Sequence, residues 1–303
     1  MIGMKRAARL LAGAWMSVAC VAAVAADTPV VFDVGTMHVV RHGDRGSTVI
    51  LIPGLASGSW VWKDVMATLQ TEHRVYAVTL AGFDGRPAVD GDGLALANQS
   101  LHELIVSQRL DKPVLVGHSL GGTLALMFAA AHSELIAGVV AVDGLPVFPT
   151  TEGTPVAQRA VLAERIRAQL KVSRSEFEAQ QLQYMRHIGV IGEEKALALA
   201  RLAARSDPAA TADYAARFMA LDLRSQMRSI RVPVMELSPY LASDYAAMGI
   251  DEAGKTAYYR SLLAGVEKLE VVSIPQARHF AMIDQPKAIM QALARFLSST
   301  AAP

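Results

Sequence analysis

The sequence contains little cysteine, few aromatic residues and no excess of charge of either sign. Its 303 residues include one cysteine and 6% aromatic residues, and 29 basic side chains stand against 28 acidic ones, for a formal net charge of +1. This balance provides no strong electrostatic field for nucleic acid or for an anionic membrane, so we expect neither as a partner. Hydrophobic residues make up 52% of the chain, which excludes a disordered, collagen-like or coiled-coil protein.

The first 26 residues have the pattern of a secretory signal peptide. Three basic residues precede an apolar run from Leu10 to Val24, and Ala23-Val24-Ala25 supplies a small-residue cleavage site. An uncleaved membrane anchor and a lipoprotein signal are the alternatives, but the run is shorter than the roughly 20 residues of a spanning helix. We therefore expect an exported protein, periplasmic or secreted, without a stable membrane anchor.

Cleavage after residue 26 would change the chemistry available to the exported chain. It would remove three of the 29 basic residues and none of the 28 acidic ones, which leaves a formal charge of −2. It would also remove Cys20, the only cysteine. Disulfides, thiolate metal sites and cysteine catalysis are then excluded for the exported protein.

Two periodicities alternate along the rest of the chain. Six short apolar runs rich in β-branched residues have the composition of strands buried on both faces. They cover residues 48–52, 74–78, 113–116, 138–142, 232–237 and 269–274. Helical patterns lie at about 60–71, 97–110, 121–132, 255–264 and 286–298. The alternation predicts a doubly wound, mostly parallel α/β sheet.

One region interrupts this alternation. Residues 146–229 contain no convincing strand but four helix-forming segments, at 156–170, 175–187, 193–204 and 209–218. The region follows the fourth apolar run, which would place it over the carboxyl ends of the parallel strands, where such sheets bind ligands. We interpret it as a helical cap between two core segments, 27–145 and 230–303. A helical appendage remote from the ligand site is the alternative.

A nucleophile motif follows the third apolar run. Residues 117–121 read Gly-His-Ser-Leu-Gly, and a small-residue helical pattern comes directly after them. Strand, G-x-S-x-G and helix form the context of a nucleophile elbow, in which glycines are needed because the turn is too tight for side chains. Ser119 would stand at the head of the helix, where the helix dipole favours developing negative charge. A closely packed glycine turn without catalytic function is the alternative.

Two further motifs extend this pattern. Residues 51–60 place Pro-Gly-Leu after the first apolar run, and residues 277–286 place His279 between the last apolar run and the last helical pattern. With the Ser119 elbow, these motifs make the chain resemble an α/β-hydrolase from about Thr36 to Leu297. The resemblance implies an α/β-hydrolase fold and a serine nucleophile with a histidine base.

The resemblance also implies roles for main-chain groups. In the family, the residue after the loop glycine and the residue after the nucleophile donate backbone N–H groups to an oxyanion hole, which corresponds here to Leu55 and Leu120. Pro53 replaces the family's usual histidine, but main-chain donation does not need that side chain. His279 corresponds to the base, because an imidazole can take up and release a proton near neutral pH. His118 competes for this role, although neighbouring residues at a sharp elbow point in different directions, which favours a packing role.

Two carboxylates compete for the third position of the triad. Family members often take the acid from just after the strand that corresponds to the run 232–237, where this chain has Asp244, late and without the usual glycine. A minority take it from the end of the strand before the cap, where Asp143 stands. Either could hold the imidazole in one tautomer and stabilise its charged form. We favour Asp143, and an Asp that only caps the turn with Gly144 is the alternative.

Three other patterns suggest different chemistry. Residues 41–45 spell the R-H-G-x-R opening of histidine phosphatases, but the second His motif of that family is absent. His38 and His42 resemble half of a metal site, and residues 90–93 imitate the start of a calcium loop, but neither pattern is completed. We interpret these last two patterns as polar turns, and we expect no metal and no cofactor.

The sequence therefore predicts serine acyl transfer on a small-molecule substrate. Ser119 would attack a carbonyl carbon, and aromatic and methionine side chains at positions 60, 62, 184, 185, 218 and 219 suggest an apolar pocket, although each could be an ordinary core residue. The expected reaction is hydrolysis of a carboxylic ester of a small or medium apolar compound. A C–C bond hydrolase, a lactonase, an amidase and a non-catalytic ligand-binding protein remain open, and the oligomeric state is not indicated.

Overall fold

The computed structural model describes residues 28–300. The expected signal peptide and Cys20 lie outside the described residues. Eight strands form one sheet: β1 (Val30–Val34), β2 (Met37–His42), β3 (Thr48–Ile52), β4 (Arg74–Thr79), β5 (Val114–His118), β6 (Gly138–Val142), β7 (Val234–Tyr240) and β8 (Leu269–Pro275). Their order across the sheet is β1-β2-β4-β3-β5-β6-β7-β8, and the neighbours from β4 to β8 pair in parallel. The predicted doubly wound, mostly parallel sheet is confirmed.

The first two strands correct one interpretation of the sequence. β1 and β2 pair antiparallel, and β2 pairs antiparallel with β4, so His38 and His42 lie on an edge hairpin and not in a polar turn. Met37 and Val39 are buried, whereas His38 and Val40 are half-buried. This alternation of period two is typical of a strand with one covered face, and the charged residues at its end obscure it in the sequence.

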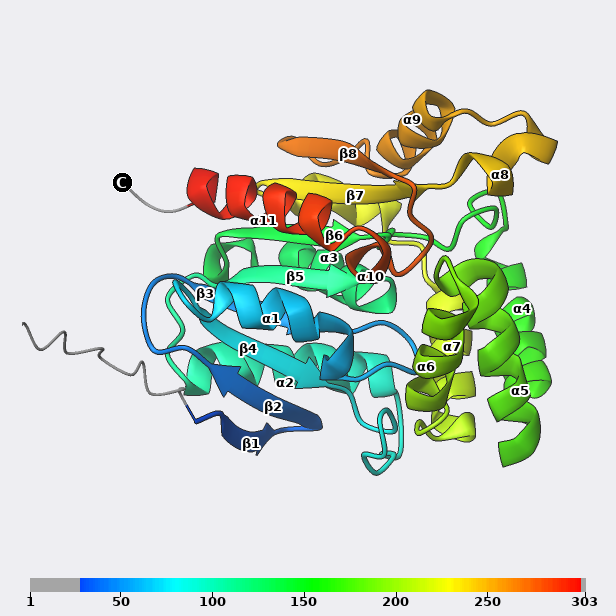
Figure 1. Cartoon of the computed structure of the whole chain (residues 1–303), viewed down its shortest axis with the longest axis horizontal. Helices are drawn as coiled ribbons and strands as arrows, with labels where there is room; N and C mark the ends of the chain where they lie inside the picture. Colours follow the sequence, from blue (N-terminus) through cyan, green and yellow to red (C-terminus); the bar gives the residue numbers. More distant parts are fainter. Residues whose placement is uncertain (1–27, 301–303) are drawn as a thin grey trace, which may run out of the picture.

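Helices cover both faces of the sheet (Figure 1). The core helices are α1 (Lys63–Leu69), α2 (Gly93–Ser107), α3 (Leu120–His132), α9 (Glu252–Leu262) and α11 (Pro286–Thr300). Side chains of α2, α3 and α9 belong to one hydrophobic cluster, and those of α1 and α11 to another. The sheet therefore lies between two helical layers, as its fully buried central strands β3, β5 and β6 require.

The region 146–229 is helical, with α4 (Val156–Leu170), α5 (Arg174–Tyr184), α6 (Glu193–Ala203) and α7 (Pro208–Ala220). One π-helical turn, Met185–Gly189, follows α5. Among the described residues of this region the only β pairing is an isolated bridge between Val147 and Asp222. Figure 1 shows these helices gathered beyond the carboxyl ends of the parallel strands. The four predicted helices are present, and their helix ends differ from the prediction by only a few residues.

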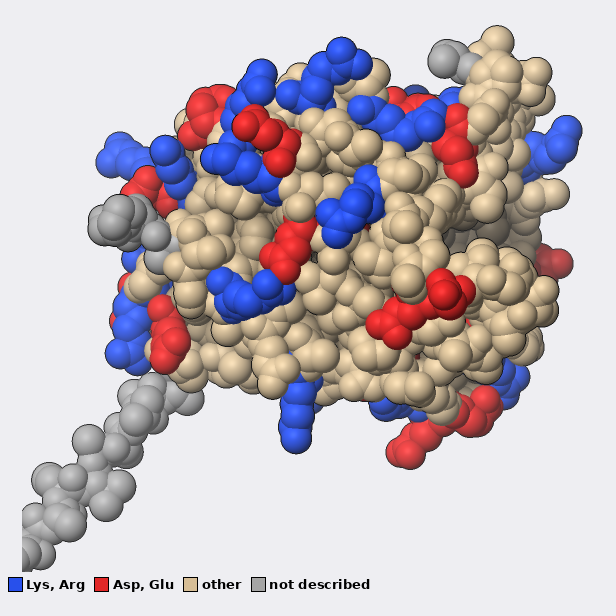
Figure 2. All heavy atoms as spheres, turned by 90° about the horizontal axis from the view of Figure 1, so that it is seen from above, with Lys and Arg blue, Asp and Glu red and all other residues tan. Residues whose placement is uncertain are grey.

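The surface mixes charges of both signs. On the face shown in Figure 2, basic and acidic side chains lie interspersed over the helices and loops. None of the helices within residues 28–300 is both long and apolar enough to cross a membrane.

Candidate active site

Ser119 occupies a sharp turn between β5 and α3. Its backbone has φ 53° and ψ −120°, a conformation that non-glycine residues rarely adopt. The turn is held from both sides, because the Ser119 N–H donates to the carbonyl of Val142 at 2.9 Å and the Ser119 carbonyl accepts from the N–H of Thr123 at 3.0 Å. A strained residue that the surrounding structure fixes in this way is typical of a functional site.

Two glycines make this turn sterically possible. A Cβ added to Gly117 would lie 2.5 Å from the backbone nitrogen of Gly122, and one added to Gly121 would lie 2.5 Å from the carbonyl oxygen of Pro53. Both distances are too short for real side chains, so the main chains of β5, α3 and the loop after β3 touch directly. The G-x-S-x-G spacing thus reflects backbone contacts that only glycine allows.

The loop after β3 lies against the serine. A Cβ added to Gly54 would lie 3.1 Å from the Cβ of Ser119, so Leu55, the next residue, belongs to a segment in contact with the elbow. Leu120 is the first residue of α3, so its backbone N–H has no partner within the helix. The two N–H groups predicted to form the oxyanion hole therefore come from adjoining segments of the main chain.

The His279 imidazole binds Asp143. Nδ1 of His279 lies 2.5 Å from Oδ2 of Asp143, and the two side chains are 16% and 13% exposed. Asp143 directly follows β6 and has φ 52°, and its N–H donates to the carbonyl of Leu237 on β7 at 3.0 Å. The turn after β6 thereby aims the carboxylate at the histidine.

Asp244 has a different partner. Its carboxylate accepts from Nε and Nη2 of Arg278 at 2.8 and 3.0 Å. This two-point ion pair involves the loop 276–280 after β8, here called the His279 loop. The structure brings Asp143, and not Asp244, to the imidazole.

The contact between His279 and His118, the residue before Ser119, places the imidazole near the serine. The His279 ring lies 4.6 Å from the ring of His118, centroid to centroid, and His118 directly precedes the serine. Among the described residues, no hydrogen bond joins the Ser119 hydroxyl to the imidazole. Such bonds are often long in a free enzyme and tighten when substrate binds.

His118 is a buried, neutral packing residue. It is 1% exposed, and this burial, together with the nearby His279, lowers its pKa to about 3. Its Nε2 lies 3.0 Å from the carbonyl oxygen of His279, and a carbonyl only accepts, so Nε2 carries the hydrogen. His118 therefore holds the loop of the predicted base.

Asp143 stays ionised in this setting. Burial alone would raise its pKa, but the neighbouring His279 and its hydrogen bond, with smaller contributions from Lys255 and Tyr259, hold the pKa of Asp143 well below its usual value. The ionised carboxylate binds the imidazole through Nδ1, which leaves Nε2 free to exchange a proton. This is the electrostatic arrangement that a histidine base requires during proton transfer.

Three buried polar residues beside Asp143 are not predicted from the sequence: Glu236 on β7, and Lys255 and Tyr259 on α9. Tyr259 donates a hydrogen bond to Oδ1 of Asp143. One signal could have revealed part of this cluster. Glu236 interrupts an apolar run that predicts a strand buried on both faces, and a carboxyl group in such a strand needs a physical reason.

The helical region contributes main-chain contacts to the His279 loop. The N–H of His279 donates to the carbonyl of Ile188 at 3.1 Å, and the N–H of Phe280 donates to the carbonyl of Gly189 at 2.9 Å. Both acceptors belong to the π-helical turn Met185–Gly189. The predicted base is thus positioned partly by the helical region, and π-helical turns are frequent at functional sites.

Two side chains reinforce this junction. Arg278 donates from Nη1 to the carbonyl of Arg186 at 2.7 Å. The carboxylate of Asp284, 1% exposed, accepts from the N–H groups of Ile191 and Arg278, both at 3.1 Å. The helical region and the His279 loop therefore share a polar, partly buried contact.

The aromatic and methionine side chains expected at a pocket do not gather at one place. Tyr184 packs edge-on against His279 at 6.1 Å between ring centroids, and Trp60 stacks at 6.5 Å on Phe280, the next residue. Trp62 and Met185 are buried in a hydrophobic cluster, and Phe218 packs on Phe148 at 5.5 Å. Tyr184 and Trp60 thus lie at the His279 loop, while Trp62 and Met185 are core residues.

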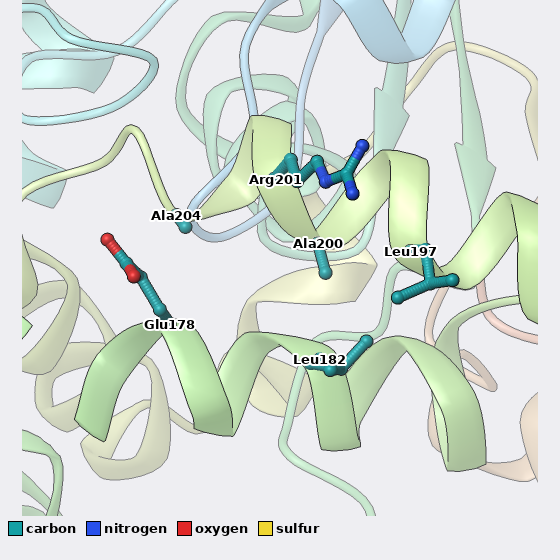
Figure 3. Close-up of a pocket in the computed structure, with 6 residues that line it drawn as sticks. All are labelled: Glu178, Leu182, Leu197, Ala200, Arg201 and Ala204. Atoms are coloured by element: carbon teal, nitrogen blue, oxygen red, sulfur yellow. The ribbon is translucent and has the colours of Figure 1, made fainter. Parts of the chain in front are cut away.

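One cavity of about 310 Å³ lies inside the helical region (Figure 3). It is lined by Glu178, Leu182, Leu197, Ala200, Arg201 and Ala204. Leu182 of α5 and Leu197 of α6 point toward each other across it. None of its lining residues belongs to the predicted site. Within residues 28–300, no group of three His, Cys, Asp or Glu side chains is arranged to hold a metal ion.

Curated relatives match part of the chain. The 1-acylglycerol-3-phosphate O-acyltransferase ABHD5 of Rattus norvegicus is 33% identical over 121 residues, which are 38% of this chain and 34% of that protein. The pimeloyl-[acyl-carrier protein] methyl ester esterase of Yersinia enterocolitica is 26% identical over 121 residues, 40% of this chain and 45% of that protein. The matches thus span less than half the length of these relatives.

Solved structures match nearly the whole chain. The enol-lactonase from Burkholderia xenovorans LB400 has a TM-score of 0.69 at 20% identity and covers 86% of this chain and 96% of its own. The thermophilic esterase from Thermogutta terrifontis also has a TM-score of 0.69 at 20% identity and covers 91% of this chain and 100% of its own. At this identity the likeness concerns the fold. The model of the alpha/beta hydrolase family matches residues 49–292, and the chain therefore belongs to this hydrolase family.

Proposed function

We propose that this hydrolase is an exported serine hydrolase, periplasmic or secreted, that cleaves a carboxylic ester or a related acyl bond of a small or medium apolar molecule. Ser119 is the nucleophile, His279 the general base, and Asp143 the triad acid. Leu55 and Leu120 supply the oxyanion hole through their backbone N–H groups. The esterases among the similar proteins support an acyl bond as the target.

The contact between His279 Nδ1 and Asp143 Oδ2, at 2.5 Å, carries this proposal. An imidazole bound through Nδ1 to an ionised carboxylate has its Nε2 free to exchange a proton. That imidazole lies beside an elbow whose serine has a strained backbone and a half-buried side chain. Acyl transfer uses Ser119, His279 and Asp143 together, whereas the stability of the fold does not require these three residues side by side.

The reaction proceeds in two halves. In the first, Ser119 Oγ attacks the carbonyl carbon while His279 takes the hydroxyl proton, and the tetrahedral oxyanion receives hydrogen bonds from Leu55 and Leu120. His279 then returns the proton to the leaving alcohol, which departs and leaves an acyl-enzyme. In the second half, His279 takes a proton from water, whose oxygen attacks the acyl carbon, and then gives this proton to Ser119 Oγ as the acid departs.

The test is hydrolysis of p-nitrophenyl esters of increasing acyl length by the purified chain, beside its Ser119→Ala variant. We expect turnover by the parent and a loss of at least about 10⁴-fold in the variant, because no other group can form the acyl-enzyme. Equal thermal unfolding of the two proteins is the control that the fold is intact.

A serine-directed fluorophosphonate separates the remaining alternatives. Labelling of Ser119 without turnover of any ester would support the assigned catalytic residues and exclude esters as the substrate. Lactones, amides and compounds with a cleavable C–C bond would then be tested. Absence of both labelling and turnover would overturn the proposal and favour a ligand-binding protein.

A further inference from the structure

The carboxylate of Asp143 has two hydrogen-bond partners among the described residues. Oδ2 binds Nδ1 of His279, and Oδ1 accepts from the hydroxyl of Tyr259. No backbone N–H group within residues 28–300 binds either oxygen. The orientation of the carboxylate on the imidazole therefore depends on one tyrosine, which comes from a helix 116 positions further along the chain.

The Tyr259 ring is itself held in place. Tyr259 is 5% exposed and lies on α9, one helical turn after Lys255, which is also 5% exposed. The ammonium of Lys255 donates to the carbonyl of Pro239 at the end of β7 and lies 4.9 Å from the centroid of the Tyr259 ring. A desolvated cation over an aromatic face is attractive, so Lys255 restrains the ring from one side.

The direction of the Tyr259 hydrogen bond follows from the charges. Burial and the nearby Asp143 raise the pKa of Tyr259 well above its usual value, so the hydroxyl keeps its hydrogen. The pKa of Asp143 is held below its usual value, so its carboxylate is ionised and can only accept. A neutral hydroxyl that donates to a buried carboxylate is a charge-assisted bond, stronger than a bond between neutral groups.

Burial favours the uncharged forms of three other titratable groups near this cluster. Burial, followed by the charge of Asp143, raises the pKa of Glu236 well above its usual value. Burial also raises the pKa of Tyr184 and lowers that of His118. The ionised form is favoured for Asp143 alone among these carboxyl and phenol groups, and the Lys255 ammonium lies over the Tyr259 ring.

We propose that Tyr259 is a positioning residue that fixes the carboxylate of Asp143 against His279, and that Lys255 holds the Tyr259 ring for this purpose. The proposal rests on the proposed function. The last torsion of an aspartate is soft, so a carboxylate with one partner can rotate away from the imidazole. With Oδ1 bound to Tyr259, Oδ2 stays on Nδ1 while the imidazole gains and loses its proton.

The test compares two neighbouring tyrosines in the full chain. Tyr259→Phe removes the bond to Asp143, and Tyr258→Phe removes a hydroxyl of the same helix that instead binds Glu152 and the N–H of Thr150. For Tyr259→Phe we expect kcat on p-nitrophenyl esters to fall by about tenfold to hundredfold, with KM within about twofold. Tyr258→Phe should retain the parental kcat within about twofold.

A double-mutant cycle distinguishes positioning from a general structural role. In an Asp143→Asn background the hydroxyl has no carboxylate to position, so Tyr259→Phe should cause no further loss in the rate of fluorophosphonate labelling of Ser119. The same fractional loss in both backgrounds, or a parental rate in Tyr259→Phe alone, would overturn the proposal.

If Tyr259→Phe does not fold, Lys255→Met is measured in the same cycle, with an expected loss of about threefold to tenfold. A parental rate there would also overturn it.

The parent protein separates this inference from the function it rests on. If the parent is not labelled at Ser119, the proposed function fails and this inference fails with it. If the parent is labelled and Tyr259→Phe is labelled equally fast, the function stands and only the role of Tyr259 is lost.

Discussion

The end of the sheet and the helical region beside it are built on different physical principles. At the sheet end, β5, β6 and α3 meet through main-chain contacts, with Gly117 and Gly121 too close to their neighbours for any side chain. The helical region instead contacts the His279 loop through hydrogen bonds that Arg278 donates and that Asp284 and two backbone carbonyls accept. The sheet end tolerates almost no added atom. The contact between the helical region and the His279 loop instead consists of polar groups that can exchange their hydrogen-bond partners with water.

The function requires more rigidity at the sheet end than at the junction with the helical region. Acyl transfer requires the nucleophile and the oxyanion donors at fixed positions, and close backbone packing provides this. The base loop is held partly by the helical region, so that region also affects its alignment. We expect changes at the sheet end to abolish activity or folding, and changes at the junction to have graded effects.

We expect the largest loss of kcat from substitution of Asp143, and substitution of Asp244 is the comparison. Asp143→Asn should lower kcat by about 10⁴-fold, because the neutral side chain no longer stabilises the protonated imidazole and can hold the wrong tautomer. Asp244→Asn removes only a partly exposed ion pair with Arg278 and should leave kcat within about threefold. Steady-state ester kinetics on both variants measure this. The reverse order of effects would assign the triad acid to Asp244.

A pair of glycines compares the packing of the two regions. Gly117→Ala should destabilise the fold by at least about 3 kcal/mol, because its Cβ collides with backbone atoms that cannot move independently. Gly153→Ala, in the exposed turn before α4, meets no atom within 4 Å and should change the free energy of unfolding by less than about 0.5 kcal/mol. Urea denaturation of both variants gives the values. Equal stability would show that the elbow can relax.

The junction of the two regions can be loosened at Asp284. Asp284→Asn removes one buried acceptor for the N–H groups of Ile191 and Arg278, and should cost about 1–3 kcal/mol. Hydrogen exchange at Ile191 and along α6 should accelerate, with a smaller loss of kcat. Lys195→Ala, which removes a partly exposed partner of the same carboxylate, is the matched control and should be nearly neutral. Unchanged exchange in Asp284→Asn would contradict the role of this contact.

The smallest expected effect concerns pH and Glu236. In the unfolded chain this carboxyl ionises above its ordinary pKa of 4.5, whereas the folded protein keeps it neutral because its pKa is raised. The folded state then binds one more proton, so stability falls as pH rises above that value. Glu236→Gln removes this dependence. The unfolding temperature of the variant relative to the parent should therefore increase between pH 4.5 and pH 8, and a constant difference would contradict a raised pKa.

Local sequence patterns predict much of the fold. The six strands from β3 to β8 are visible as short, mostly apolar runs, because a strand between two helical layers needs no polar side. The edge hairpin of β1 and β2 is missed because its pattern is half polar. The elbow is predictable at the level of single residues, since steric contact restricts positions 117 and 121 to glycine.

The rest of the site depends on contacts between distant segments. The sequence favours Asp143 over Asp244 only by its place along the chain, and the folded geometry distinguishes the partner of His279 from the partner of Arg278. Tyr259 and Lys255 lie in an ordinary helical pattern, so nothing local indicates their contact with β6 and β7. The π-helical turn that binds the His279 loop is likewise a local departure from a regular helix that composition does not reveal.

The most direct measurement is mass spectrometry of the chain after reaction with a fluorophosphonate, for the parent and for Asp143→Asn. Our account predicts one adduct on the peptide that contains Ser119, formed in the parent at a rate about 10³-fold or more above that in the variant. No adduct, an adduct on another residue, or equal rates in the two proteins would contradict the assignment of Ser119, His279 and Asp143 as one catalytic unit.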